Sequence, residues 1–458
     1  MKEVNPIRTP WIIIFSLLMT SCSFFNRSIH KEPVIIPAKW DAINAQLTTS
    51  EQNLSCIAWW KQFKDPALNA LIEKGLKRNN DIHVATANIE AALGELKRVK
   101  LNWIPGVNEL AGYSSFPNLG FPGVVVAAIP TYTLNVLSQI KEQQKAQFSV
   151  KITKNTRDTV KLAVIAQIAE SYFNHLAEIE QLKLLQAVER DVKEDVAINK
   201  STYSGGLSSD ITLSQAESRL NLIQSEEFVI KKNIIASQNM MRYLLNENPA
   251  KWSFTQTFSQ INSHQMIIGA LPINVIENRP DLMEAMNTLK VTHAGVGLAI
   301  SNFLPTIQLS ALFGDIGTVP NGTHLGMPIT FKQGLLEGPL INLSNFGELD
   351  KARGLKKAAY YRYLNVLRKI LRDVSTDLSA QSFYSQRLHE TTRAEKNLDN
   401  AYQLNRDLYQ KGIISYATLL KEKTELDKIK ITVNQHKLEQ LITIVKLYQD
   451  LAVGYGCS

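Results

Sequence analysis

The stretch DIHVATANIEAALGELKRVKLNWIP, residues 81–105, is followed 200 positions later by DLMEAMNTLKVTHAGVGLAISNFLP, residues 281–305. In both stretches apolar residues recur at alternating steps of three and four. Such a ladder is typical of a helix that packs in coiled-coil fashion, and the closing proline disfavours helix in the residue before it. Two copies of one helix-then-proline unit predict an internally duplicated chain. The first ladder consists of Ile82, Ala85, Ile89, Ala92, Leu96, Val99 and Trp103, and the second of Leu282, Ala285, Leu289, Thr292, Val296, Ala299 and Phe303.

The helix that carries the first ladder is expected to begin at Pro66 and to end before Pro105. Asp65 directly precedes Pro66, and this pair predicts an N-cap followed by proline at the first helical position.

The apolar period changes to two after each closing proline, Pro105 and Pro305. Alternation predicts strands at residues 131–137 and 306–313, and residues 107–115 are a weaker strand candidate. Residues 339–346 are expected to form the second strand of the second hairpin. Residues 116–130 and 314–338 are rich in glycine and proline and are predicted to form loops. Each half is therefore expected to hold one two-stranded hairpin with a long loop. Alternation alone does not separate a membrane hairpin from a small soluble ribbon.

A very long helix is expected after each hairpin. Residues 138–202 contain neither proline nor glycine, and the corresponding residues 349–410 contain only Gly354. At 1.5 Å per residue, the first helix would span roughly 95 Å. Such lengths far exceed the usual helix and predict a coiled-coil architecture.

A second duplicated signature closes each long helix: YSGGLSSDITL at residues 203–213 and YQKGIISYATL at residues 409–419. Tyr203 and Gly206 match Tyr409 and Gly412, and a serine follows each glycine. A glycine and then a serine between two periodic runs indicate a helix C-terminus followed by an N-cap. We therefore predict two helical hairpins, each with a returning antiparallel helix. The offset is now 206, so the halves differ by six residues in length.

The N-terminus indicates export. Lys2 and Arg8 precede a short apolar run at residues 11–19, which reads as a secretory signal over residues 1–21 and is too short to span a membrane. Cys22 follows two small residues and resembles the lipidated cysteine of a bacterial lipobox, although Met19 replaces the usual leucine. This resemblance implies a lipid-anchored N-terminus at Cys22, and Ser23 favours the outer membrane. The alternative is an ordinary signal peptide with an incidental cysteine.

Enzyme, metal and nucleic-acid chemistry find no support in the sequence. It contains no GxxxxGK[ST], HExxH or GxSxG motif, and its eight histidines are isolated. Cys22, Cys56 and Cys457 form no metal-ligand pattern, and whether Cys56 and Cys457 are paired stays open. The net charge of +8 is scattered along the chain rather than clustered, as nucleic-acid binding would require. We expect no enzymatic activity and no cofactor.

Four strands per chain set a constraint on assembly. Membrane barrels need at least eight strands, and unpaired strand edges are not tolerated in lipid. The coiled-coil seams also require neighbours. A cyclic homo-oligomer that shares one barrel satisfies both requirements.

With these features the chain resembles the outer membrane factor family of tripartite efflux systems, the TolC/OprM-like channels, and specifically their lipoprotein branch. The resemblance extends from Cys22 to about Gly456. It implies a mixed, mainly α protomer with a long periplasmic α-barrel, and a homotrimer with a shared 12-stranded β-barrel in outer membrane lipid. It also implies two partners, a periplasmic adaptor and an inner-membrane RND-type pump. The matching residues are Cys22, Trp59, Trp60, Phe63, Asp65, Pro66, Arg279, Pro280, Asp281, Asn302, Phe303, Leu304, Pro305, Tyr409, Gly412, Thr418, Leu419 and Leu420.

The expected organisation comprises a signal peptide at 1–21, a tether at 22–58, and two structural repeats at 59–260 and 261–458. Pro105 and Pro305 are expected at α-to-β junctions near the membrane surface, far from Gly206 and Gly412.

The periplasmic gate departs from the family pattern. Lys421 occupies a position where the family often has an aspartate, and Thr424 a position where an arginine is usual. A ring of lysines would invert the local field of an acidic ring. Asp210, Asp407, Lys421 and Glu422 are the candidate gate residues. The alternative is that all four are ordinary solvated helix surface.

Three functions are consistent with the sequence. The first is a passive exit duct of an efflux pump for small molecules such as drugs or metal ions. The second is the duct of a type I protein secretion system. The third is a lipid-anchored periplasmic coiled-coil protein without a pore, which would have no need for two hairpins at equivalent places.

Overall fold

A computed structural model describes residues 56–114, 123–252, 254–261, 276, 278–318, 325–339 and 342–456. The predicted signal peptide and most of the predicted tether, with Cys22, lie outside these residues, as does Cys457. The chain forms two compact units. The sheet unit comprises the described parts of Ile89–Thr153 and Glu284–Asn365, and the helical unit those of Pro37–Asn88, Lys154–Met283 and Val366–Ser458.

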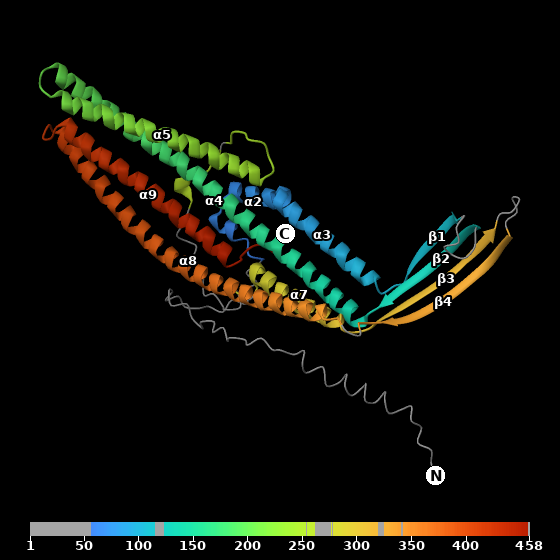
Figure 1. Ribbon diagram of the computed structural model, residues 1–458. Helices are drawn as coiled ribbons and strands as arrows, with labels where there is room; N and C mark the ends of the chain where they lie inside the picture. Colours follow the sequence, from blue (N-terminus) through green and yellow to red (C-terminus); the bar gives the residue numbers. More distant parts are fainter. Residues whose placement is uncertain are drawn as a thin grey trace, which may run out of the picture. The chain divides into compact units, whose positions relative to one another are not determined.

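The sheet unit is built around one antiparallel sheet with the strand order β1–β2–β3–β4 (Figure 1). Hairpins β1–β2 and β3–β4 come from the two halves of the chain, and β2 pairs with β3 to join them. The prediction of two hairpins is therefore confirmed. The strands are β1 (Gly106–Ser114), β2 (Gly123–Leu134), β3 (Thr306–Thr318) and β4 (Leu325–Glu337).

The predicted bounds of the second strand in each hairpin were wrong. β2 begins inside the predicted loop at 116–130, and β4 lies inside the predicted loop at 314–338, whereas helix α8 already begins at Ser344. The cause is pairing, because the 13-residue strand β4 pairs along its length with β3 despite two glycines and a proline. Gly314 in β3 allows a close approach, since a Cβ there would lie 2.5 Å from the Cβ of Ala127.

Pro130 interrupts the strand pairing between β2 and β3 without shifting its register. Ala128 pairs with Phe313 and Thr131 with Ser310, while Ile129 and Pro130 make no pair with β3. A proline has no N–H to donate to the ladder. The strand continues because the pairs on either side keep the same alignment.

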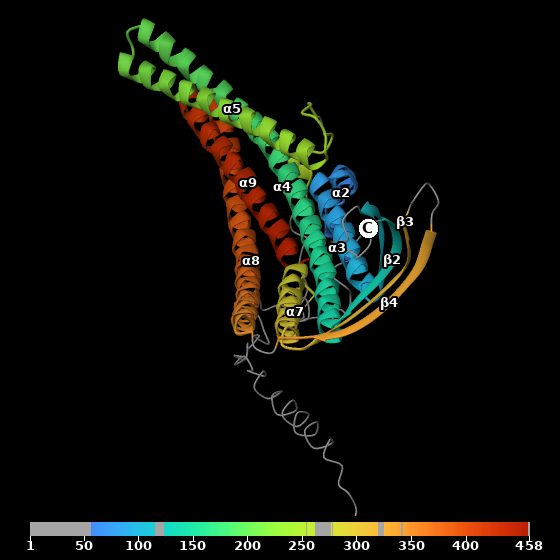
Figure 2. The same ribbon diagram turned by 45° about the vertical axis from the view of Figure 1, so that its right-hand side comes forward.

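The two sheet faces differ in polarity. Side chains alternate between faces along each strand, and the observed register places seven of the nine large exposed apolar side chains of these strands on one face. The same face also carries the exposed Glu109, Asp315 and Lys332, and the other two exposed apolar side chains, Phe331 and Leu335, lie on the opposite face. On the opposite face, Asn108 donates to Thr131 and Gln308 to Glu337. The sheet is curved in both views (Figures 1 and 2). The apolar sheet face consists of Val107, Tyr113, Val126, Ile307, Leu309, Phe313 and Leu336.

Long antiparallel helices dominate the helical unit. α4 pairs with α5 and α8 with α9, and both connecting turns lie at the same end of this unit (Figures 1 and 2). The two predicted long helices and both helical hairpins are confirmed. Within the described ranges, no helix carries an apolar window long enough to cross a membrane. The helices are η3 (Trp59–Phe63), α2 (Pro66–Arg78), α3 (Asn80–Leu101), α4 (Val136–Ser204), α5 (Asp210–Leu244), η4 (Phe258–Gln260), α7 (Pro280–Ser301), α8 (Ser344–Gln410) and α9 (Tyr416–Asp450).

The first six residues of the first ladder lie on α3 as predicted, whereas the seventh, Trp103, follows the end of the helix and is exposed. Ile82, Ala85, Ile89 and Val99 are buried. Ala92 and Leu96 are half-buried, and every other residue of α3 is exposed. The three-four spacing therefore marks the packed face of this helix residue by residue.

A single helix from Pro66 to the first ladder was also expected, and this was wrong. The chain leaves helical geometry at Asn79, which has ψ 128°. Its side-chain oxygen accepts hydrogen bonds from the backbone N–H groups of Asp81 and Ile82, at 2.9 and 3.2 Å. Asn79 therefore acts as the N-cap of a separate helix, α3.

The Trp59-Trp60 pair and Asp65 belong to the core of the helical unit. Both tryptophans are fully buried, and the ring of Trp59 stacks on Tyr448 with centroids 4.9 Å apart. Asp65 caps α2 by accepting from the N–H groups of Ala67 and Leu68, as predicted. It also accepts a 2.6 Å hydrogen bond from the hydroxyl of Tyr172 on α4. This part of the sequence motif thus serves packing.

Candidate functional site

Two α-to-β junctions lie in the sheet unit, and the predicted prolines occupy equivalent places in them. α3 ends at Leu101 and β1 begins at Gly106, directly after Pro105. α7 ends at Ser301 and β3 begins at Thr306, directly after Pro305. Each helix closes with a tight last turn, in which residue 104 or 304 donates its N–H three residues back. The proline then prevents a further helical residue.

Side-chain amides from the following helices fasten these junctions. The Gln139 amide donates to the carbonyl of Asn102 at 3.2 Å, and the Asn345 amide donates to the carbonyl of Asn302 at 2.9 Å. Phe303 and Phe346 also pack edge to face, 5.0 Å apart. The last carbonyls of α3 and α7 would otherwise lack partners. The start of each long helix thus holds the preceding helix-to-strand junction.

The two helical turns have the same backbone geometry. Gly206 has φ 72° and Gly412 has φ 73°. The N–H after each glycine reaches five residues back: Leu207 donates to the carbonyl of Thr202 at 2.8 Å, and Ile413 to that of Leu408 at 2.9 Å. This is the Schellman motif, in which glycine takes the left-handed position at lowest cost. The matching glycines therefore have a backbone role.

Each turn presents an apolar residue to solvent. The Leu207 side chain is 84% exposed and that of Ile413 is 65% exposed. A Schellman turn often folds this residue back onto its helix, but here neither side chain is used in that way. Tyr203 and Tyr409 are partly exposed, and the ring of Tyr409 lies 5.4 Å from that of Tyr416.

The four predicted gate residues are dispersed near these turns. Asp210 is the first residue of α5, Asp407 lies in the last turn of α8, and Lys421 and Glu422 lie in the second turn of α9. Asp210, Asp407 and Lys421 are exposed and Glu422 is half-buried. No ion pair joins any two of the four in the described part of one chain. One chain alone does not bring them together.

A buried charge cluster on α4 and α9 was missed in the sequence. The Lys423 ammonium pairs with the Asp191 carboxylate, and Lys430 lies 3.6 Å from the carboxylate of Asp427. Asp191 and Asp427 are almost fully buried. Burial, and a hydrogen bond with Asp191, raise the pKa of the Asp427 carboxyl. Asp427 therefore favours its protonated form beside the Lys423–Asp191 pair.

The sequence does carry a signal for this cluster, because charged residues occupy positions of α9 where the helical spacing calls for apolar ones. Tyr416, Leu420, Lys423, Asp427 and Lys430 follow the three-four spacing of α9, so Lys423 and Asp427 occupy core positions. Lys421 was the sequence-based candidate instead because it occupies the position where the family often has an aspartate.

Tyr416 provides a further contact between α9 and α4. Its hydroxyl is hydrogen-bonded to the carboxylate of Glu194, which raises the pKa of Tyr416 to about 12. The phenol therefore remains a neutral donor throughout the physiological range. Together with the Lys423–Asp191 pair, this bond ties the start of α9 to the last part of α4.

Substitution by alanine should destabilise the protein at the two turn glycines and stabilise it at a glycine inside a helix. Replacing Gly206 or Gly412 by alanine forces a Cβ into the left-handed region, so each variant should lose about 1 kcal/mol of stability. Gly354, inside the N-terminal part of α8 with open space around it, is the control, and alanine there should add roughly 0.5–1 kcal/mol. Thermal unfolding followed by helical circular dichroism measures all three. A Gly206→Ala protein as stable as Gly354→Ala would contradict the assignment.

The contribution of the Lys423–Asp191 pair to the folding stability should depend on pH. Lys423→Met leaves the buried Asp191 carboxylate without its cation, next to the second buried carboxyl group of Asp427. The cost should be about 2 kcal/mol near pH 7, less than for a fully buried pair because Lys423 is partly exposed. The exposed Lys421→Met is the control and should change stability by less than ~0.5 kcal/mol.

The sign of this pH effect follows from Asp427. Its raised pKa means that the protonated carboxyl favours the folded state, and this contribution is lost as the pH rises through that pKa. The difference in stability between Lys423→Met and the wild type should therefore become smaller when the pH falls from about 7 to about 4.5. Equal deficits at both pH values, measured by thermal unfolding, would exclude the carboxyl pair as the cause.

Comparisons with known proteins agree with this architecture. Residues 71–247 and 271–453, more than half of the chain, match the family model "Outer membrane efflux protein". The solvent efflux pump outer membrane protein SrpC of Pseudomonas putida is 24% identical, over 97% of this chain and 98% of its own. The probable outer membrane lipoprotein SilC of Salmonella typhimurium is 21% identical, over 96% and 97%.

A solved structure shares the fold. The CmeC outer membrane channel of Campylobacter jejuni superimposes with a TM-score of 0.78 at 20% identity, covering 94% of this chain and 95% of its own. The expectation of a mainly helical protomer with four antiparallel strands is thus confirmed. The chain belongs to the outer membrane efflux protein family and is an outer membrane channel for efflux rather than an enzyme.

Proposed function

We propose that the protein is the passive exit duct of a tripartite efflux pump, conducting small molecules from the periplasm to the outside. The observation that carries this proposal is the apolar sheet face, which holds seven of the nine large exposed apolar side chains of the strands in a curved sheet. An exposed surface in which large apolar side chains predominate marks a membrane or partner contact. Lipid suits this face, and the opposite face with its polar pairs suits a water-filled lumen.

The sheet edges support a homotrimer. β1 and β4 each pair with one neighbour in the described chain, so their outer edges are open. An unsatisfied backbone group in lipid costs several kcal/mol, and pairing β4 of one copy with β1 of the next removes both edges. Three copies give a shared barrel of twelve strands, the number that the family resemblance implies.

The turns at Gly206 and Gly412 supply a contact for a periplasmic adaptor. Leu207 and Ile413 are exposed apolar residues that their own turns do not use. An adaptor that covers them would bury apolar surface at roughly 25 cal/mol per Å². Transport energy would come from an inner-membrane RND-type pump, which the adaptor connects to the duct.

The substrates we propose are small organic molecules or metal ions. SrpC is described as part of a solvent efflux pump, and another relative, CusC, as a cation efflux system protein. The pump selects the substrate, so one duct fold serves several chemistries.

Lipid anchoring at Cys22 is part of the same proposal. The lipobox-like sequence before Cys22 supports it, as does the description of SilC as a probable lipoprotein. Radiolabelled palmitate should enter the wild-type chain and be absent from Cys22→Ser. Equal labelling of both chains would rule out this anchor.

We place the periplasmic gate at the turn end of two structural repeats, 59–260 and 261–458. Asp210, Asp407, Lys421 and Glu422 lie within two helical turns of the connecting loops, so a trimer would bring three copies of each around one axis. Pro105 and Pro305 would then lie near the membrane surface. Lys421 gives this ring a positive member, which weakens its attraction for cations.

The decisive test is conductance. Purified full-length protein should run as a trimer after crosslinking and should give single-channel steps in planar bilayers. Lys421→Asp should shift the ion selectivity toward cations, whereas Lys396→Asp on α8 serves as a charge-matched control. Absence of channels at any voltage, with a trimer intact, would overturn the duct and favour a structural protein.

The adaptor contact predicts a separate effect at the turns. Leu207→Asp and Ile413→Asp should reduce the adaptor recovered after mild crosslinking at least fivefold, because each buries a charge in an apolar contact. Bilayer conductance should remain, since neither residue belongs to the barrel. The exposed Leu404→Asp on α8 is the matched control. Unchanged recovery in both turn variants would move the adaptor contact elsewhere.

A further inference from the structure

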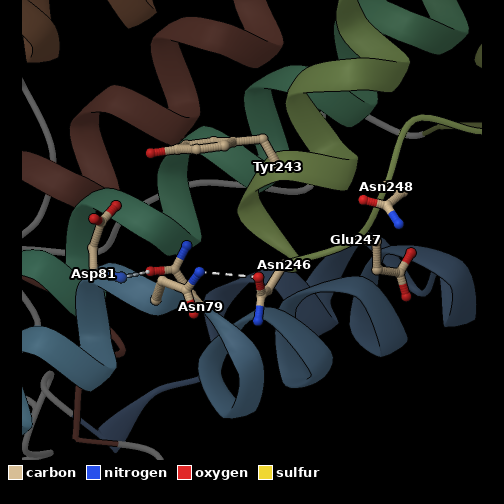
Figure 3. A pocket seen from close by; sticks show the side chains of 7 residues that line it. Asn79, Asp81, Tyr243, Asn246, Glu247 and Asn248 are labelled. Carbon is tan, nitrogen blue, oxygen red and sulfur yellow. Dashed lines mark hydrogen bonds between the residues drawn. The ribbon is translucent and has the colours of Figure 1, made fainter.

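A polar pocket lies in the helical unit, where the break between α2 and α3 meets the end of α5 (Figure 3). Its volume is about 180 Å³. The Asn79–Asp81 segment forms one side, and Tyr243 with the Asn246–Asn248 segment forms the other. None of these residues has a part in the duct proposed above.

The two sides of the pocket are fastened to each other. The Asn79 amide donates to the carbonyl of Leu244 at 2.9 Å, and the Asn80 amide donates to the side-chain oxygen of Asn246 at the same distance. Asn246 holds a left-handed conformation, φ 55°, at the end of α5, and asparagine tolerates this region well. The pocket is therefore preformed.

Glu247 ties the Asn246–Asn248 segment to helix α2. Its carboxylate pairs with Lys74 of α2 and accepts from the guanidinium of Arg242 at 2.5 Å. These contacts, that with Lys74 first, lower the pKa of Glu247. Arg242 in turn lies 3.9 Å from the ring centre of Trp252. The charge of Glu247 is thus neutralised within the protein.

Three groups in the pocket remain available. The Asp81 carboxylate, the Asn248 amide and the Tyr243 hydroxyl have no partner among the described residues. The Tyr243 side chain is 64% exposed. In Figure 3 its ring extends across the pocket above Asn79 and Asn246, with the hydroxyl directed toward the side of Asp81. The pocket thus combines a free aromatic face with a free acceptor and a free amide.

We propose that this pocket binds a saccharide, with one pyranose ring on the face of Tyr243. The negative face of an aromatic ring attracts the weakly positive C–H bonds of a sugar ring. An asparagine amide both donates and accepts, and a carboxylate accepts from hydroxyl or amide N–H groups. An N-acetylated sugar supplies both kinds of partner, an N–H for Asp81 and a carbonyl for Asn248.

The size of the pocket indicates one ring of a longer chain. Its volume of about 180 Å³ is below the roughly 300–1,000 Å³ of pockets that enclose whole small-molecule ligands. In the periplasm, where the proposed function places these residues, the N-acetylated glycan of the cell wall has this chemistry. The inference rests on the proposed function for that compartment alone. Soluble sugars are the other source of the same chemistry.

The test uses the purified full-length protein with two probes, isolated cell-wall sacculi and soluble N-acetylglucosamine oligomers. The wild type should sediment with sacculi, and the oligomers should compete. Tyr243→Ala should weaken oligomer binding about tenfold, which corresponds to ~1.4 kcal/mol, while Tyr243→Phe keeps the ring face and should stay within about twofold. Tyr361→Ala, at an exposed tyrosine of α8, is the matched control and should bind like wild type.

Each result has one meaning. Sedimentation with competition identifies the cell-wall glycan, and oligomer binding without sedimentation identifies a soluble sugar. Absence of binding to both probes, or equal binding by Tyr243→Ala and wild type, overturns the site. Bilayer conductance of Tyr243→Ala is measured in parallel and should be unchanged. A loss of conductance in every protein would refute the duct and leave the sugar measurement valid.

Discussion

A β-strand satisfies its backbone only through a neighbouring strand, and this requirement governs how the two halves of the chain combine. Each half contributes one hairpin, and a lone hairpin is marginal at best in water. Pairing of β2 with β3 merges the two hairpins into one sheet. The same pairing explains Gly314, where β2 comes too close for a side chain. The duplication therefore has a physical use, because neither half completes its own sheet.

The sequence predicted the helices far better than the strands, for a physical reason. A helix forms its hydrogen bonds within its own segment, so the three-four ladder of α3 appears intact in the sequence. The strands depend on partners remote in sequence. Gly326, Pro328 and Gly334 indicated a loop, yet they lie in β4 because β3 pairs along it. The break at Asn79 was missed for a similar reason, since the apolar period continues across it.

The candidate site could be predicted in its backbone but not in its charges. The glycines at 206 and 412 followed from the need for a left-handed residue, and both have positive φ. Which lysine of α9 is buried depends on how α9 rotates against α4. Lys423 faces Asp191, whereas Lys421, two residues earlier, faces solvent. A shift of two residues turns a helix side chain by about 200°, so small differences in packing decide which charge matters.

The two halves fasten equivalent points by different chemistry. In the first half, the Asn79 amide ties the start of α3 to the carbonyl of Leu244, the last residue of α5. In the second half, Arg279 precedes α7 and lies 3.8 Å from Asp450, the last residue of α9. Both ties connect the start of a ladder helix to the end of its returning helix.

These two ties differ in their response to pH. A hydrogen bond between an amide and a carbonyl involves no titratable group, so the tie at Asn79 is indifferent to pH. The tie at Arg279 involves Asp450, whose carboxyl interacts with Asp377. Burial, and next the hydrogen bond with Asp450, raise the pKa of Asp377 to about 7. Ionisation of Asp377 places a further negative charge beside the carboxyl group of Asp450. The charge around the tie at Arg279 therefore changes near neutral pH, whereas the charge around the tie at Asn79 does not.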